Sequence, residues 1–120
     1  MTSKRVQTAP KHLALGTKRW WLQVTTDYEL EPHHVRLLTL AAEAWDRGQE
    51  AREIIAEKGL TFETRLGEMR ANPAVAIERD SRLAFARLLR ELDLDISVPS
   101  SDVRPPRLRS TNGLAWNKGV

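Results

Sequence analysis

Apolar residues recur in steps of three and four along residues 72–94, the spacing that places them on one face of a helix. The stripe contains Val75, Phe85 and Leu89. The side chain of Asn72 can accept a backbone N–H of the first turn, and Pro73 suits the first helical position, where a missing N–H is no loss. The pattern predicts a long helix that begins after Asn72 and needs an apolar partner to be stable.

A second long helix is predicted over residues 31–58. Pro32 again suits a first helical turn, and Gly59 is typical of the residue that follows a helix. The apolar residues between Val35 and Trp45 cover more than one face, so we expect this half of the helix to be buried on two sides. Gly48 lies within the pattern, where it indicates either a bend or a close approach of two backbones.

Two shorter elements complete the pattern. Thr17 can cap a helix over residues 18–28, which would place Trp21 on the apolar face and Trp20 on its flank. Residues 59–71 lose the helical spacing and alternate weakly, which predicts either a short hairpin or an ordered loop.

The expected fold is therefore all-α: a short N-terminal helix, then a long antiparallel helix pair with a short hairpin or loop between its members. Residues 16–95 form this helical oligomerisation core, between a flexible basic N-terminal segment (1–15) and a flexible basic C-terminal tail (96–120). So few helices bury little apolar surface in one chain, and self-association is the simplest remedy.

Charge is separated along the chain. Residues 1–19 contain five Lys or Arg residues and no acidic residue, and residues 96–120 carry a net charge of +3, so the middle is acidic although the whole chain is +3. Basic ends on an acidic body favour contact with a polyanion such as DNA, or they merely keep the protein dissolved. A set of arginines on the last helix (Arg79, Arg82, Arg90) provides either ion pairs between helices or a second basic surface for a DNA backbone.

The chain carries little that catalysis or a cofactor would need. There is no cysteine, no glycine-rich phosphate loop and no long apolar run. His33 and His34 are consecutive at a helix start, so we expect their rings to diverge and not to chelate one metal. We expect a non-enzyme without cofactor or metal and without membrane association.

Several features together resemble the small subunit of the terminase of tailed bacteriophages. They are the Asn72-Pro73 start of a long helix, the Gly59-Leu60 break before it, the Trp20-Trp21 helix and the segment Pro10-Lys11-His12-Leu13. The resemblance extends from Pro10 to Arg109. One departure is that Asp93 and Asp95 stand near the helix end, where we would expect a glycine.

This resemblance implies a role in viral genome packaging in the host cell cytoplasm. It implies a homo-oligomeric ring of about eight to twelve subunits, with nine favoured. The ring would bind double-stranded viral DNA and would recruit and regulate the large terminase subunit, which carries the ATPase and nuclease. The alternative is a small helical transcriptional regulator or antitoxin, which would need polar base-reading residues at the start of a short helix. A pure adaptor that never touches DNA also stays open.

Each expected role is assigned to particular residues. The candidates for DNA binding are Lys4, Arg5, Lys11, Lys18, Arg19, Arg79, Arg82 and Arg90. The candidates for oligomerisation are Trp21, Leu38, Trp45, Val75, Phe85 and Leu89. The candidates for binding the large subunit are Arg104, Arg107, Arg109 and Trp116, because a lone tryptophan in a polar, basic tail would suit an anchor that orders on a partner.

Overall fold

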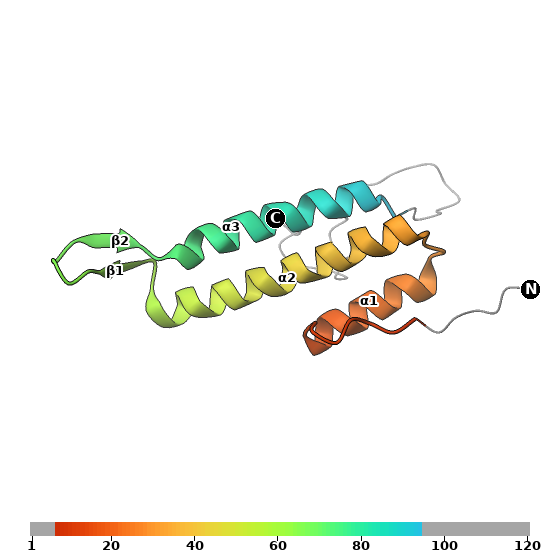
Figure 1. Cartoon of the computed structure of the whole chain (residues 1–120), viewed down its shortest axis with the longest axis horizontal. Coiled ribbons are helices and arrows are strands. Elements are labelled where there is room, and N and C mark those ends of the chain that lie inside the picture. The colour runs from red at the N-terminus through yellow and green to blue at the C-terminus, as the bar shows by residue number, and fades with distance from the viewer. Residues whose placement is uncertain (1–6, 95–120) are drawn as a thin grey trace, which may run out of the picture.

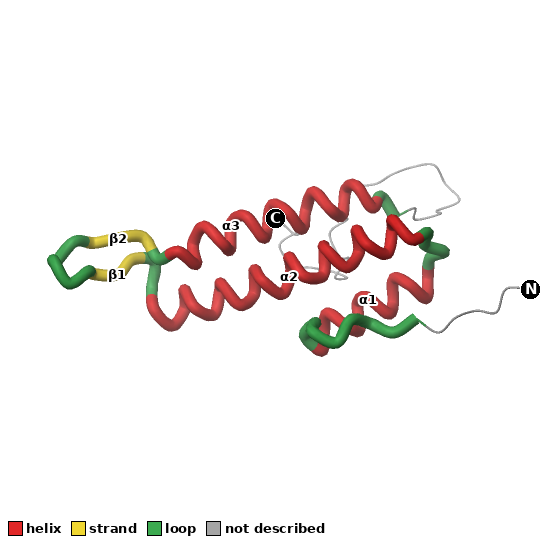
Figure 2. The backbone as a smooth tube through the Cα atoms, in the orientation of Figure 1, coloured by secondary structure: helices red, strands yellow, loops and turns green. Residues whose placement is uncertain are grey.

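The computed structural model describes residues 7–94, which form three helices and one β-hairpin (Figures 1 and 2). In chain order the elements are α1 (Leu15–Asp27), α2 (Pro32–Lys58), β1 (Thr61–Glu63), β2 (Met69–Ala71) and α3 (Pro73–Leu92). The hairpin lies at one end of the antiparallel pair α2–α3, and α1 lies beside the N-terminal half of α2 at the other end. The predicted order of helices is confirmed, and the described part of the chain is mostly helical with a small two-stranded sheet.

Small residues let α2 and α3 pack closely. Ala41, Gly48 and Ala51 of α2 are buried, as are Ala74 and Ser81 of α3. A Cβ atom on Gly48 would lie 3.5 Å from the Cβ of Ser81. Of the two interpretations that the sequence left open for Gly48, the structure therefore supports a close approach between helices.

The main apolar core lies where α1 crosses the N-terminal half of α2. Trp21 is 2 % exposed and packs with Val24 against Leu38 and Ala42, and Leu92 from the end of α3 closes the same cluster. The indole N–H of Trp21 donates to the hydroxyl of Thr39 at 3.2 Å, so burial of the ring leaves no polar atom without a partner.

A carboxylate from another helix caps α1. The helix begins at Leu15, earlier than expected, and Thr17 is not its N-cap. Asp46 of α2 accepts the backbone N–H of Ala14 at 2.8 Å and the hydroxyl of Thr17 at 2.5 Å. Asp46 thus binds the N–H of the N-cap residue Ala14 and places a negative charge at the N-terminus of α1, where it complements the helix dipole.

The segment before α1 is more ordered than its sequence indicated. Ala9 and Leu13 are buried in the core, and His12 contacts the carboxylate of Glu43 at 2.7 Å. Polar composition suggested a flexible segment through residue 15, but the buried side chains of Ala9 and Leu13 and the bond from Ala14 to Asp46 hold residues 9–14 against the helices. Residues 1–6 and 95–120 lie outside the described part of the chain.

The break between the long helices is a hairpin. Its strands pair antiparallel, with Thr61 opposite Ala71 and Glu63 opposite Met69. Gly67 adopts φ 82° in the connecting turn, and the hydroxyl of Thr64 accepts the backbone N–H groups of Leu66 and Glu68. The expected all-α class is therefore corrected by one small sheet, which the weak alternation had left as one of two possibilities.

The last helix ends without a glycine. Asp93 takes the C-cap position in the left-handed conformation, φ 43°, and its backbone N–H donates to the carbonyl of Leu89 at 3.0 Å. Aspartate tolerates this conformation better than most residues, which explains how the chain departs from the expected glycine and still stops the helix at Leu92.

Candidate assembly groove and basic surface

Three aromatic side chains from three different helices lie together in an open groove. Trp20 of α1 and Trp45 of α2 both contact Phe85 of α3, with ring centroids 6.0 and 5.2 Å apart and tilted planes. The groove has a volume of about 680 Å³ and extends to the start of α1. Trp45 remains 44 % exposed and Trp20 and Phe85 are half-buried, so the described chain covers this aromatic cluster only in part. We call it the assembly groove.

Acidic residues of α2 edge the assembly groove. Asp46, Glu50 and Glu53 follow helical spacing along one side of it, with Gln49 between them. Asp46 is occupied by the start of α1, whereas Glu50 and Glu53 form no ion pair with any residue that the structure describes. The groove therefore combines an aromatic floor with uncompensated negative charge at its edge.

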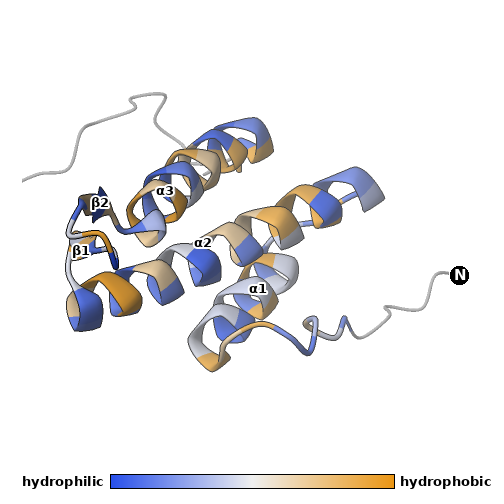
Figure 3. Ribbon diagram, turned by 60° about the vertical axis from the view of Figure 1, so that its left-hand side comes forward, coloured by the Kyte–Doolittle hydropathy of each residue, from blue (hydrophilic) through white to orange (hydrophobic). Residues whose placement is uncertain are grey.

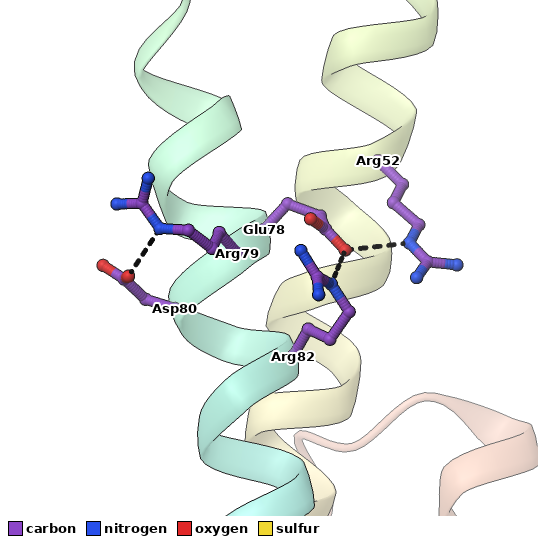
Figure 4. A network of polar contacts seen from close by, with 5 residues as sticks. All are labelled: Arg52, Glu78, Arg79, Asp80 and Arg82. Carbon is purple, nitrogen blue, oxygen red and sulfur yellow. Dashed lines mark hydrogen bonds and ion pairs between the residues drawn. The ribbon is translucent and has the colours of Figure 1, made fainter.

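A cluster of ion pairs joins α2 to α3 beside this groove (Figure 4). Both Arg52 of α2 and Arg82 of α3 donate to the same carboxylate oxygen of Glu78, each at 3.2 Å. The Glu78 side chain is only 15 % exposed. The hydrogen bond from Arg82 is the largest cause that lowers the pKa of Glu78; partial burial opposes it, and the hydrogen bond from Arg52 adds to it. Glu78 thus stays ionised and holds the two helices in register.

The proposed oligomerisation residues divide into two groups. Trp21 and Leu38 are buried within the chain itself, with Leu38 at 0 % exposure, and have no surface to offer to another subunit. Trp45 is exposed, and Val75, Phe85 and Leu89 are half-buried on α3. Helical periodicity shows the apolar stripe but does not show which of its members the same chain covers.

The proposed DNA-binding residues are also divided. Lys11, Lys18 and Arg19 lie at and just before the first turns of α1, where Lys11 and Arg19 are exposed. Arg82 is paired with Glu78, and Arg79 contacts Asp80 at 3.4 Å, so the interpretation of this arginine set as ion pairs accounts for two of its members. Arg90 is exposed and makes no ion pair within residues 7–94.

Some predicted residues lie beyond the described chain. These are Lys4 and Arg5 at the N-terminus and Arg104, Arg107, Arg109 and Trp116 at the C-terminus. Their assignments rest on sequence alone.

The paired histidines serve the start of α2. The rings of His33 and His34 lie 4.1 Å apart and do not diverge as expected. Nδ1 of His34 accepts the backbone N–H of Glu31 at 3.1 Å, which makes half of a capping box with Glu31. Within residues 7–94 there is no cluster of three or more His, Asp or Glu side chains suited to a metal, and no helix is long and apolar enough to cross a membrane.

The functional residues that sequence reasoning missed are those whose role depends on a distant partner. Nothing in the local sequence distinguishes Asp46 or Glu78 from the other acidic residues of the helices, and only the contacts with α1 and Arg52 reveal their roles. The exposed apolar side chains of the hairpin were equally hidden, because a weak strand pattern does not say what covers the strand.

Comparison with known families identifies the chain. A family described as phage terminase, small subunit, matches residues 18–101, which include α2, the hairpin, α3 and all of α1 except its first three residues. No curated protein and no solved structure matches the chain. Because the match spans most of the sequence and agrees with the resemblance carried by Asn72-Pro73 and Trp20-Trp21, the chain belongs to the phage terminase small-subunit family.

Proposed function

We propose that this protein is a non-catalytic subunit of a phage DNA-packaging motor, which binds viral double-stranded DNA and recruits and regulates the large ATPase-nuclease subunit in the cytoplasm of the host cell. The family match over residues 18–101 carries this proposal. The uncovered assembly groove and the basic residues at the start of α1 add physical support, because a ring subunit needs an apolar contact surface and a DNA-binding subunit needs accessible positive charge.

Assembly is the first part of the proposal. Trp45 and Phe85 lie in the assembly groove, where a neighbouring subunit would cover them, and Val75 and Leu89 are half-buried on the same helix as Phe85. A closed ring of about eight to twelve copies, with nine favoured, is the expected species. Trp21 and Leu38 contribute to this indirectly, through the core that holds α1 against α2.

DNA contact is the second part. We assign it first to the basic N-terminus, where Lys4, Arg5, Lys11, Lys18 and Arg19 stand with no acidic residue among them. Arg79 and Arg82 are weaker candidates because Asp80 and Glu78 already balance their charge, whereas Arg90 remains available. Binding would be mainly to the phosphate backbone, and each neutralised phosphate would add about 0.9 to the slope of log affinity against log salt.

Recruitment of the large subunit is the third part, and we assign it to Arg104, Arg107, Arg109 and Trp116. A tryptophan anchor flanked by arginines suits a segment that orders on a partner surface. Removal of residues 101–120 should leave the ring intact and abolish its stimulation of the large subunit. Unchanged stimulation by the shortened protein would contradict this assignment.

The deciding experiment for the proposal is a mass measurement in native buffer, followed by DNA binding at several salt concentrations. A ring-sized species whose DNA affinity falls steeply with salt supports a packaging subunit. A stable dimer that prefers one DNA sequence would instead indicate the regulator or antitoxin alternative, and a ring without DNA affinity would indicate an adaptor.

A further inference from the structure

The hairpin is left exposed by the rest of the described chain. Its strands pair only with each other, all six strand residues are exposed, and it projects past the ends of α2 and α3 (Figure 1). Figure 3, coloured by hydropathy, shows hydrophobic ribbon at β1. It nevertheless carries large apolar side chains, all of them exposed: Leu60, Phe62, Leu66 and Met69. An isolated two-stranded hairpin is marginally stable in water, so a partner that covers these side chains would stabilise it.

The tip of the hairpin combines an apolar side chain with a positive charge. Leu66 is 85 % exposed, and the adjacent Arg65 is exposed and forms no ion pair with the residues described. The turn that carries them is held by the hydroxyl of Thr64 and by a hydrogen bond from the N–H of Gly67 to the carbonyl of Thr64, 2.9 Å long. The tip therefore presents Leu66 and Arg65 on an ordered turn, at a low entropic cost of binding.

The assembly groove has the complementary chemistry. Its floor of Trp20, Trp45 and Phe85 suits an apolar side chain, and the carboxylates of Glu50 and Glu53 at its edge suit a guanidinium group. Aromatic rings also attract a neighbouring guanidinium through their negative faces. A ligand that carries leucine beside arginine therefore matches both features of the groove.

A chain cannot place its own hairpin in its own groove. Trp45 and the end of α2 at Lys58 are separated by about 20 Å of helix, at a rise of about 1.5 Å per residue. The hairpin also points away from the helices along their long direction (Figure 2). A hairpin that fills the groove therefore has to come from another copy of the chain.

We propose that the hairpin tip of one subunit inserts into the assembly groove of the next, with Leu66 over the aromatic floor and Arg65 beside Glu50 and Glu53. The two surfaces differ, so the contact is head-to-tail, and repetition of such a contact closes into a ring when its rotation divides a full turn. This inference rests on the proposed ring and specifies which surfaces build it.

Engineered cysteines test the contact directly, because the natural chain has none. The variant with both Leu66→Cys and Gln49→Cys, under mild oxidation, should give a ladder of covalent multimers that ends at the ring size. An equimolar mixture of the two single variants should give covalent dimers only, and neither single variant should cross-link alone. Leu40→Cys is the matched control for Gln49→Cys, because Leu40 is an exposed α2 residue outside the groove, and its combination with Leu66→Cys should not form the ladder.

Charge reversal tests the polar half of the contact. Arg65→Glu should weaken subunit association about tenfold, and Glu53→Arg should do the same because like charges then face each other. Combination of both changes in one chain should restore association to within a few-fold of the natural protein. Arg36→Glu is the control, since Arg36 is an exposed α2 residue outside both the hairpin and the groove.

The outcomes separate this inference from the proposed function. A ring of natural mass that shows no cross-link between positions 66 and 49, and no response to Arg65→Glu, would overturn the hairpin contact and leave the ring intact. A natural protein that stays monomeric at high micromolar concentration would overturn the ring and the hairpin contact together.

Discussion

The side-chain amide of Asn72 donates to the backbone carbonyl of Gly59 at 2.8 Å and so ties the start of α3 to the end of α2. The side-chain oxygen of Asn72 accepts the N–H of Ala74 at 2.9 Å, as an N-cap does. The backbone N–H of Asn72 donates to the carbonyl of Leu60 at 2.8 Å. One buried residue therefore joins both long helices and the base of the hairpin, which sets the direction in which the hairpin projects.

Substitution of Asn72 should separate its role as the N-cap of α3 from its hydrogen bond to Gly59. Asn72→Ser keeps an acceptor for the helix cap but cannot reach Gly59 with a donor, whereas Asn72→Ala loses both. We expect Asn72→Ala to cost about 1–2 kcal/mol of unfolding free energy and Asn72→Ser less. Urea denaturation measures the costs, and amide exchange of hairpin residues measures its anchoring. Equal protection of the hairpin in Asn72→Ser and the natural protein would show that the bond to Gly59 does not orient it.

Glu78 predicts a pH dependence of stability in the acid range. Its pKa is lowered in the folded protein, chiefly by Arg82, so the ionised form is favoured by folding. The stabilisation is fully present above the ordinary carboxyl pKa and is lost as the pH falls through the lowered value. Glu78→Gln should therefore lower the free energy of unfolding at pH 7. The difference in unfolding free energy between this variant and the natural protein should shrink at acid pH. Glu57→Gln, at an exposed carboxylate of the same helix pair, is the control and should show no such trend.

The close approach of the two helices at Gly48 predicts opposite effects on stability for a small and a large side chain at this position. Alanine at this position adds a Cβ at an ordinary contact distance of 3.5 Å from Ser81, so helix propensity should dominate and raise stability by up to about 1 kcal/mol. Leucine has no space between the two helices and should lower the thermal midpoint. A loss of stability in Gly48→Ala would mean that the helices pack more tightly than this distance indicates. Gly16→Ala, with open space around it, reports propensity alone.

Substitution of Trp21 should impair folding, whereas substitution of Trp45 should impair assembly. Trp21 is buried in the core, so Trp21→Ala should cost about 3–5 kcal/mol and reduce helical content. Trp45 lies in the assembly groove, so Trp45→Ala should leave the helical spectrum largely intact and shift the mass from ring to smaller species. Circular dichroism and light scattering on the same samples check both. An intact ring in Trp45→Ala would remove the aromatic groove from the proposed interface.

The DNA-binding assignment predicts a hierarchy among basic residues. Replacement of Lys18 and Arg19 by alanine should lower the salt slope by about 0.9 for each phosphate that the variant no longer neutralises. Arg82→Ala should change it less, because Glu78 already balances the charge of Arg82. Fluorescence anisotropy with a DNA duplex from low to moderate salt gives the slopes. A larger effect from Arg82 than from Lys18 would place the DNA on α3 instead.

Local sequence was sufficient to predict the helices. Asn72-Pro73 and Pro32 mark helix starts, and Gly59 marks a stop, because capping and backbone preference act within one turn. Periodic apolar positions predicted which faces need partners, and the order of features was enough to suggest the family. Over residues 59–71 the alternation of apolar and polar residues was too short and too weak to distinguish a hairpin from a loop.

Contacts between distant segments were decided only by the tertiary structure. Trp21 and Trp45 both lie on apolar helix stripes, but the packing of α1 on α2 buries Trp21 and leaves Trp45 in an open groove. Asp46 caps a helix about thirty residues earlier in the chain, and Glu78 gathers arginines from two helices. Periodicity shows which residues share one face of a helix. Whether such a residue is buried, and whether its charge is balanced, depends on which other element packs against that face. The packing of the whole chain determines this.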